Sequence, residues 1–197
     1  MHWDTTTYEA LRAAVAGRVI GPGDRDYDEA RTIFYGGFAR RPAAIARVAG
    51  ANDVARAVRL AADAGIELAV RSGGHSVAGH GTTEGGIVID LAEMKALEVD
   101  VDTRTAWAEP GLTAGEYSVR AGKHGLATGF GDTASVGIGG ITLGGGVGLL
   151  VRAHGLTIDD LLAAEIVTAD GELLHIDDQK HPDLFWGHCC IGRQAAS

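Results

Sequence analysis

Hydrophobic and polar residues alternate in the first part of the chain with the periods of helices and short strands. Apolar residues recur every three or four positions over 54–62, which predicts a helix that Asn52 caps and Gly65 ends. Short, mostly apolar stretches on either side of it, at 43–48 and 66–70, predict two strands. A strand, a helix and a second strand in this order can form one parallel pair.

The same pattern predicts the remaining elements. Thr6 and Glu9 have capping-box spacing, so a first helix is expected to run to about Gly17, followed by an extended entry segment over 18–41. The further expected elements are a strand at 87–91, a hairpin of 99–101 with 105–108, a helix from the capping box of Thr113 and Glu116 to Gly125, and a hairpin of 161–168 with 172–176.

Glycine is the residue type that departs most from ordinary composition. There are 30 glycines among 197 residues, about twice the usual share, and they gather in loops at 71–86 and 129–148. Glycine lets several backbone N–H groups converge on phosphate oxygens, but it also serves bends and close packing, and composition leaves both explanations open. Neither loop is a P-loop, and Thr142 stands where the dinucleotide fingerprint needs its third glycine.

The net charge and the cysteine content limit the binding partners, metal sites and locations that we expect. The formal net charge of −9 argues against nucleic-acid binding and against docking on anionic membranes. No stretch approaches the ~18 apolar residues of a membrane span, and the N-terminus lacks the features of a secretory signal. Cys189 and Cys190 are adjacent, so they cannot close a useful loop, and with His188 they make a poor metal site. We therefore expect a cytoplasmic protein without a metal.

The glycine loops lie within a series of motifs that resembles a known family. Arg71-Ser72-Gly73-Gly74-His75-Ser76 resembles the flavin-attachment loop of the FAD-binding domain of the p-cresol methylhydroxylase (PCMH) or vanillyl-alcohol oxidase type. The chain is similar, more narrowly, to the berberine-bridge-enzyme-like FAD-linked oxidoreductases of bacteria. The match continues in order through 42–70, 132–148, 152–160, 164–171 and 181–186. This resemblance implies an α+β fold with two subdomains, incomplete at its C-terminal end, and FAD as the cofactor.

The resemblance also assigns the cofactor contacts. His75 matches the histidine that bonds covalently to the 8α-methyl carbon of the flavin, with His80 and His154 as the alternatives. Thr133 stands at or near the position where some relatives carry a second link through cysteine, so one covalent bond is expected. The residues expected to contact FAD are Arg71, Ser72, Gly73, Gly74, His75, Ser76, Gly131, Asp132, Thr133, Ser135, Val136, Gly137, Gly139, Gly140, Gly145, Gly148, Ile166 and Val167.

Two of the glycines carry a specific expectation, and three acidic residues have two possible explanations. Gly137 and Gly140 are expected to tolerate no side chain, because a Cβ would block the approach of amides to phosphate or force a poor dihedral. Asp159, Asp160 and Glu165 are candidates for ribose or adenine contacts, and a solvated turn explains them equally well.

The resemblance ends at Trp186, where the family continues with an Arg-Gly-Gly-Gly run that this chain lacks. We expect a frameshift or truncation there, with the substrate domain absent. The expected organisation is an N-terminal helix and entry segment at 1–34, the FAD-binding domain at 35–186 and a divergent tail at 187–197.

No catalytic residue can be named from this sequence. The family transfers hydride from a substrate C–H to flavin N5, and its substrates are alcohols, sugars or secondary metabolites. Oxygen or another acceptor then takes the electrons. The alternative for this chain is a catalytically inactive flavin-binding fragment.

Overall fold

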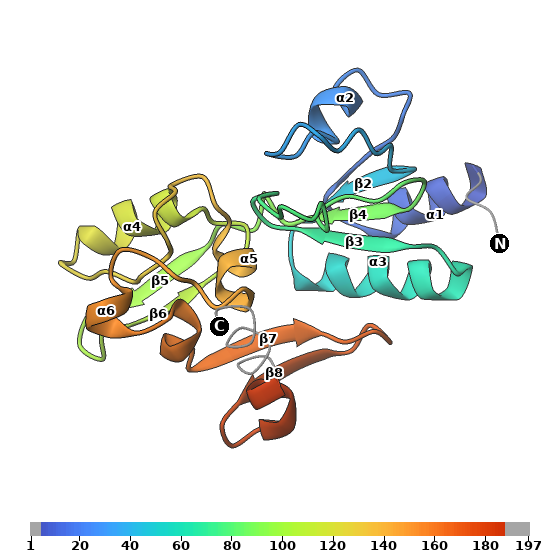
Figure 1. Ribbon diagram of the computed structural model, residues 1–197. Helices are drawn as coiled ribbons and strands as arrows, with labels where there is room; N and C mark the ends of the chain where they lie inside the picture. Colours follow the sequence, from blue (N-terminus) through green and yellow to red (C-terminus); the bar gives the residue numbers. More distant parts are fainter. Residues whose placement is uncertain (1–4, 188–197) are drawn as a thin grey trace. The chain divides into compact units, whose positions relative to one another are not determined.

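The computed structural model describes residues 5–187, which divide into two compact units. Within the described residues, the first unit consists of 5–94 and 167–174, and the second of 95–166 and 175–187. Each unit is described by itself. Both contain helices and strands, which confirms the predicted α+β class (Figure 1).

A four-stranded sheet with the order β1-β2-β4-β3 forms the centre of the first unit. β1 (Arg18–Ile20) is antiparallel to β2 (Ala44–Arg47). β4 (Ile87–Asp90) is parallel both to β2 and to β3 (Leu68–Arg71). The prediction that the strands before and after the helix pair with each other was therefore wrong. All four residues of β4 are buried, and such a strand belongs in the middle of a sheet, where both faces are covered.

Helices cover both faces of this sheet. α1 (Thr5–Ala14) and α3 (Ala51–Ala64) pack on one face, and α2 (Tyr27–Ala30) packs on the other; Figure 1 shows α3 below the strands and α2 above them. Successive strand residues point to opposite faces. Residues on the first face are Ala44, Ala46, Ile87 and Ile89, and those on the second are Ile45, Ala69 and Val88.

The predicted ends of two helices in this unit need correction. Gly50, not Asn52, is the N-cap of α3, while Gly65 ends the helix in the left-handed conformation, at φ +63°, as predicted. The side chain that satisfies free amides here is Asp53, which accepts from Ala49 N at 3.0 Å. It also accepts from the amides of residues 16 and 17, both at 2.9 Å, so this segment is drawn away from the α1 helix, which ends at Ala14.

The second unit begins with the predicted hairpin of β5 (Leu97–Asp100) and β6 (Thr105–Ala108), which are antiparallel. α4 (Ala114–Gly122) follows with the predicted capping box of Thr113 and Glu116, and it ends three residues before the predicted Gly125. The second glycine-rich stretch is partly helical, since α5 (Ile138–Leu143) lies inside it. The remaining elements of the chain are α6 (Val151–His154), a 3₁₀ turn (Thr157–Asp160), β7 (Ala163–Val167), β8 (Leu173–Asp177) and a helical segment at 182–187. Residues 167–174, with the end of β7 and the start of β8, belong to the first unit.

The last two predictions for this chain concern its location and its C-terminal tail. Among residues 5–187, no helix is long and apolar enough to cross a membrane; the cytoplasmic location stays a prediction. The divergent tail, with His188, Cys189 and Cys190, lies outside the described residues apart from Gly187.

Candidate functional site

The first glycine loop starts at the carboxyl end of the parallel strands in the first unit. Arg71 is the last residue of β3, and its register partner on β4 is Asp90. Arg47, the last residue of β2, is the other register partner of Asp90. Ligands of open α/β sheets bind outside the carboxyl ends of the strands. The loop at 71–76 therefore leaves the sheet at the edge where this rule places a ligand.

The Arg71 side chain is buried at this edge, with 6% of its surface exposed. Its Nη2 atom donates to Asp90 Oδ2 at 2.8 Å and to the carbonyl oxygen of Ala30 at 2.7 Å. Arg47 Nε donates to the same Asp90 oxygen at 3.2 Å. The Asp90 carboxylate thus lies between the guanidinium groups of Arg71 and Arg47, so these three side chains together carry a net positive charge. Nη1 of Arg71 is buried and has no hydrogen-bond partner among the described residues, which leaves one donor for an anion.

His75 lies half-buried in this loop with an aromatic ring against it. The ring centroids of His75 and Phe34 are 3.9 Å apart and the rings are inclined by 19°, which is a stacked arrangement. The backbone N–H of Phe34 donates to the carbonyl oxygen of Gly74 at 3.2 Å. Gly74 has φ +71°, a conformation that L side chains rarely adopt. Sequence reasoning missed Phe34; its only signal was an aromatic pair, with Tyr35, in a segment otherwise read as an extended entry.

The two alternative histidines, His80 and His154, are both exposed. His80 is exposed, and its backbone N–H, not its ring, bonds to Ser76 Oγ at 3.2 Å. His154 is exposed at the end of α6 in the second unit.

The second glycine loop belongs to the second unit and is paired with the start of α4. The amides of Ala114 and Gly115 donate to the carbonyls of Val136 and Ala134 at 2.8 and 2.9 Å, and Ile138 N donates to Leu112 O at 2.9 Å. These bonds hold the turn at 134–137 and the start of α5 against the start of α4. Asp132, Thr133 and Ser135 are exposed there, and Thr133 Oγ1 donates to Asp132 Oδ1 at 2.9 Å.

Glycine is not required by the backbone at the two positions where it was expected to be essential. Gly137 is the N-cap of α5 with φ −74°, which any residue adopts. A Cβ added at Gly140 has no described atom within 4 Å, and φ there is not positive. The expectation of a strained dihedral at these positions was therefore wrong, and only a ligand approaching closely would make a side chain at Gly140 costly.

Other glycines of this loop have a packing reason. A Cβ at Gly148 would lie 2.6 Å from Gly131 Cα, and one at Gly131, where φ is +82°, would lie 2.7 Å from the Ile141 side chain. Gly145 is buried with φ +94°, and a Cβ at Gly139 would lie 3.1 Å from Pro110. These positions serve the fold of the second unit, whatever else they contact.

The candidates for ribose and adenine contacts lie after α6 and along β7. Asp159 is exposed, and its carboxylate accepts from Leu156 N at 3.1 Å, which caps the 3₁₀ turn. Asp160 and Glu165 are exposed, whereas Ile166 and Val167 of β7 are half-buried. The structural role of Asp159 favours the solvated-turn explanation for that residue.

The FAD binding domain family matches residues 42–177 of this chain, more than half of its length. The chain belongs to this family. The match lies inside the range 35–186 that was predicted for the domain, whose outer limits stay a prediction.

The similar proteins include oxidases and FAD-linked oxidoreductases. (R)-6-hydroxynicotine oxidase of Paenarthrobacter nicotinovorans is 41% identical over 177 residues, which is 90% of this chain and 39% of that protein. The crystal structure of 6-hydroxy-D-nicotine oxidase from Arthrobacter nicotinovorans has a TM-score of 0.87 at 41% identity, covering 88% of this chain and 38% of that one.

A third similar protein bears on the cofactor. Glucooligosaccharide oxidase from Acremonium strictum, with a 6-S-cysteinyl, 8α-N1-histidyl FAD, has a TM-score of 0.88 at 32% identity, covering 93% of this chain and 39% of that one. The chain thus spans about two fifths of the length of the proteins it matches. These similarities confirm the predicted two-subdomain type of FAD-binding fold, the FAD-linked oxidoreductase family and FAD as the cofactor.

The residues on the first loop fit this cofactor. The pyrophosphate of FAD is anionic, and Arg71 Nη1 is a buried donor without a partner among the described residues, at the carboxyl end of β3. His75, the predicted attachment point, presents an imidazole in the same loop.

Proposed function

We propose that this chain binds FAD within residues 35–186 and holds it by a single covalent bond between an imidazole nitrogen of His75 and the 8α carbon of the flavin. The observation that carries the proposal is the position of His75, half-buried in the loop that leaves the carboxyl end of β3 and inside the family match. Support also comes from the glucooligosaccharide oxidase, whose FAD carries a histidyl link at the same carbon.

The two glycine loops would supply most of the remaining contacts with FAD. In the first unit, the amides of Ser72, Gly73 and Ser76 and the Nη1 donor of Arg71 would bind the pyrophosphate. In the second unit, the amides of the loop from Gly131 to Gly140 would bind phosphate oxygens. The backbone of Ile166 and Val167, on β7, would contact adenine. Backbone amides suit this task because they present fixed donors to negative charge.

A second covalent link is not expected. The glucooligosaccharide oxidase has a cysteinyl bond in addition to its histidyl bond. In this chain the residue assigned to that place is Thr133, an exposed hydroxyl that donates to Asp132. An alcohol oxygen is a weak nucleophile without an activating base, and thiolate chemistry is absent at this position.

The whole protein is proposed to oxidise a small organic molecule. When bound, FAD supplies a two-electron acceptor that takes hydride at N5 from a substrate C–H. The substrate class is an alcohol, a sugar or a secondary metabolite, and the names of two relatives, a hydroxynicotine oxidase and a glucooligosaccharide oxidase, fall within that range. Oxygen or another acceptor would then remove the electrons. The residues of this chain bind and orient the cofactor for that exchange.

The test is the fate of the flavin after acid precipitation. Purified wild-type chain is expected to show oxidised-flavin absorbance and to keep its flavin in the acid pellet. His75→Ala should release flavin to the supernatant, while His80→Ala and His154→Ala, as matched controls, should not. Release from the wild type, or retention by His75→Ala, would overturn the covalent assignment. Oxygen uptake with hydroxylated N-heterocycles, alcohols and oligosaccharides then separates turnover from flavin binding alone.

A further inference from the structure

The aromatic ring against His75 is unusually exposed for its size. Phe34 has 58% of its surface exposed, so its ring gains little from burial. It nevertheless stacks on the imidazole of His75 at a centroid distance of 3.9 Å. Tyr35 packs edge-on against the Phe34 ring, with centroids 5.1 Å apart at 88°. Because the ring of Phe34 gains little from burial, its packing against Tyr35 and His75 points to a role in holding the histidine.

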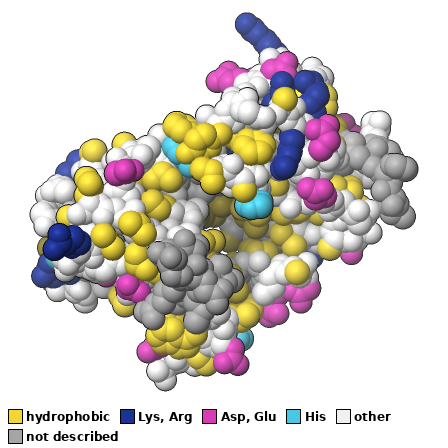
Figure 2. Space-filling view, in the orientation of Figure 1, with side chains coloured by type: hydrophobic (Ala, Val, Ile, Leu, Met, Phe, Trp, Pro, Cys, Tyr) yellow, Lys and Arg dark blue, Asp and Glu magenta, His cyan; other side chains and the backbone are white. Residues whose placement is uncertain are grey.

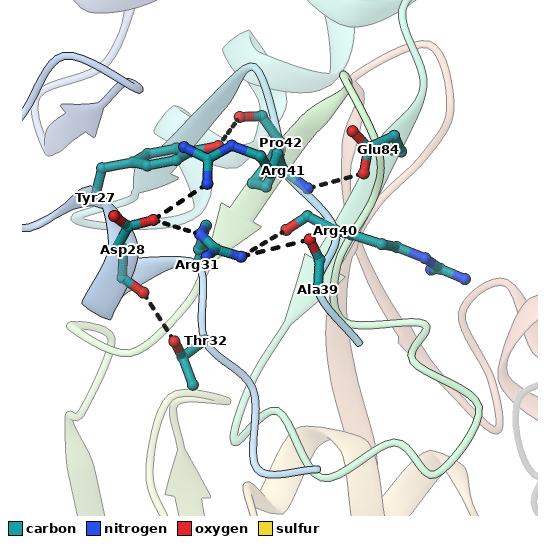
Figure 3. A network of polar contacts seen from close by, with 9 residues as sticks. All are labelled: Tyr27, Asp28, Arg31, Thr32, Ala39, Arg40, Arg41, Pro42 and Glu84. Carbon is teal, nitrogen blue, oxygen red and sulfur yellow. Dashed lines mark hydrogen bonds and ion pairs between the residues drawn. The ribbon is translucent and has the colours of Figure 1, made fainter. Parts of the chain in front are cut away.

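The segment that carries Phe34 is closed at its base by a polar network. Arg31 Nε donates to Asp28 Oδ1 at 2.7 Å, and Arg31 Nη1 reaches the carbonyl oxygens of Ala39 and Arg40 at 3.5 and 3.4 Å (Figure 3). Arg41 Nη1 donates to the same Asp28 oxygen at 3.3 Å. Residues 31–40 therefore form a loop with fixed ends, and Phe34 lies within it.

Two further hydrogen bonds connect this network to Glu84 and Pro42. Arg41 N donates to Glu84 Oε2 at 2.9 Å, and Tyr27 OH donates to Pro42 O at 2.6 Å (Figure 3). In Figure 2, basic and acidic side chains intermingle at the top of the view, where Figure 1 shows α2. The polar base of the loop thus lies at the surface and is held by charge pairs.

The loop is also tied to the first glycine loop on both sides of His75. Before it, the carbonyl oxygen of Ala30 accepts from Arg71 Nη2, and Phe34 N donates to Gly74 O at 3.2 Å. After it, Arg40 Nη1 donates to the carbonyl oxygens of Gly79 and Thr82 at 3.0 and 2.9 Å. The backbone around His75 is therefore set in place by residues 30–40.

We propose that Phe34 is a positioning residue for His75, whose ring it holds in the orientation that presents a nitrogen to the 8α carbon. This inference rests on the proposed flavin attachment. The lone pairs of imidazole lie in the plane of the ring, so a stacked phenyl ring covers one face and leaves the nitrogens open. The second side-chain torsion of histidine is otherwise broad. Holding it near one value raises the fraction of molecules in a reactive arrangement.

The bond-forming step has a simple balance. The new N–C bond replaces the N–H bond of the imidazole and one C–H bond of the 8α-methyl group. The two hydrogens leave as two protons and two electrons; the flavin takes the electrons, and oxygen removes them later. Phe34 takes no part in this exchange and acts only through the orientation of His75.

The test compares the rate of attachment with the affinity for FAD. The full chain, made without flavin, is mixed with FAD, and acid-precipitable flavin is followed with time in wild type, Phe34→Leu and Phe34→Tyr. Val77→Ala, which removes an exposed apolar side chain from the first glycine loop, two residues after His75, is the control. We expect Phe34→Leu to slow attachment about tenfold with noncovalent affinity unchanged, and Phe34→Tyr and Val77→Ala to match the wild type.

A second measurement reads the stack without any turnover. In proton NMR spectra of the flavin-free chain, the ring protons of His75 should be shifted upfield by the Phe34 ring, and the shift should vanish in Phe34→Leu and persist in Phe34→Tyr. Wild-type attachment rate in Phe34→Leu, or no upfield shift in the wild type, would overturn the role of Phe34 alone. Failure of the wild type to attach flavin at all would overturn the proposed function and this inference together.

Discussion

Arg71 donates through Nη2 to Oδ2 of Asp90 at 2.8 Å, and the two residues are register partners at the carboxyl ends of the parallel strands β3 and β4. Both side chains are buried. The pair therefore sets the point where the first glycine loop leaves the sheet. It also explains why a loop assigned to an anionic cofactor starts with an arginine whose guanidinium is largely occupied within the protein.

Asp90→Ala is expected to lower the free energy of unfolding by about 3–5 kcal/mol, because it leaves the buried charge of Arg71 without a counter-ion. Urea denaturation followed by circular dichroism measures this. Asp28→Ala, which removes an exposed carboxylate that pairs with Arg31 and Arg41, should change stability far less. Equal losses in the two variants would mean that burial of the Arg71–Asp90 pair has no special cost.

Asp53 is expected to make stability depend on acidity. Burial alone would raise the pKa of its carboxyl group, but three backbone N–H donors, from Ala16, Ala49 and Gly17, outweigh it and the pKa is lowered. The folded pKa is therefore below the unfolded value of about 3.9. The stabilisation is complete above that value and is lost as pH falls through the lowered folded pKa.

Asp53→Asn tests this dependence. The variant should be less stable than the wild type at neutral pH by about 2–3 kcal/mol, since the hydrogen bonds lose their charged acceptor. In urea titrations at several pH values, the difference should stay constant from pH 7 to about pH 5 and narrow in stronger acid. A difference that grows in acid would contradict the assigned direction.

Gly140→Ala tests whether this loop contacts the cofactor, because the substitution should lower FAD affinity without lowering stability. No described atom opposes a Cβ at this position, and alanine favours the helix, so stability should stay equal or rise by up to about 1 kcal/mol. Affinity for FAD should nevertheless fall, since the Cβ would stand where the amides approach phosphate. Gly148→Ala is the matched control, because its Cβ would collide with Gly131 and lower stability itself. FAD titration and thermal unfolding of both variants measure the two effects; unchanged FAD affinity in Gly140→Ala would remove this part of the loop from the cofactor site.

The capping box of α4 is expected to stabilise the second unit. Thr113 Oγ1 accepts from Glu116 N at 3.2 Å, and Thr113 N donates to Glu116 Oε2 at 2.9 Å. Donation from Lys95, and then from the Thr113 amide, lowers the pKa of the Glu116 carboxyl group, so the cap is complete at neutral pH. Thr113→Ala should cost about 1 kcal/mol and Thr113→Ser much less. The check is the midpoint of thermal unfolding, and an equal loss in both variants would argue against the cap.

The features that could be predicted from the amino-acid sequence are those that depend on neighbours along the chain. The period of apolar residues and the glycine at its end located α3 and its left-handed stop at Gly65, and Thr113 with Glu116 located the start of α4. A three-residue polar turn located the hairpin of β5 and β6. Each of these signals is complete within about four to fifteen residues, so local physical chemistry is sufficient. The ordered motifs around His75 likewise identified the family and its cofactor.

The relationships between residues far apart in the chain became visible in the three-dimensional fold alone. It inserted β4 between β2 and β3, joined Asp53 to the amides of residues 16 and 17, and stacked Phe34 on His75. It also showed that Gly140 is open while Gly148 packs on Gly131. No local pattern encodes such pairings, because a strand, a carboxylate or an aromatic ring is compatible with many partners. The choice among them depends on which arrangement buries the apolar surface of the whole unit while leaving its buried charges paired.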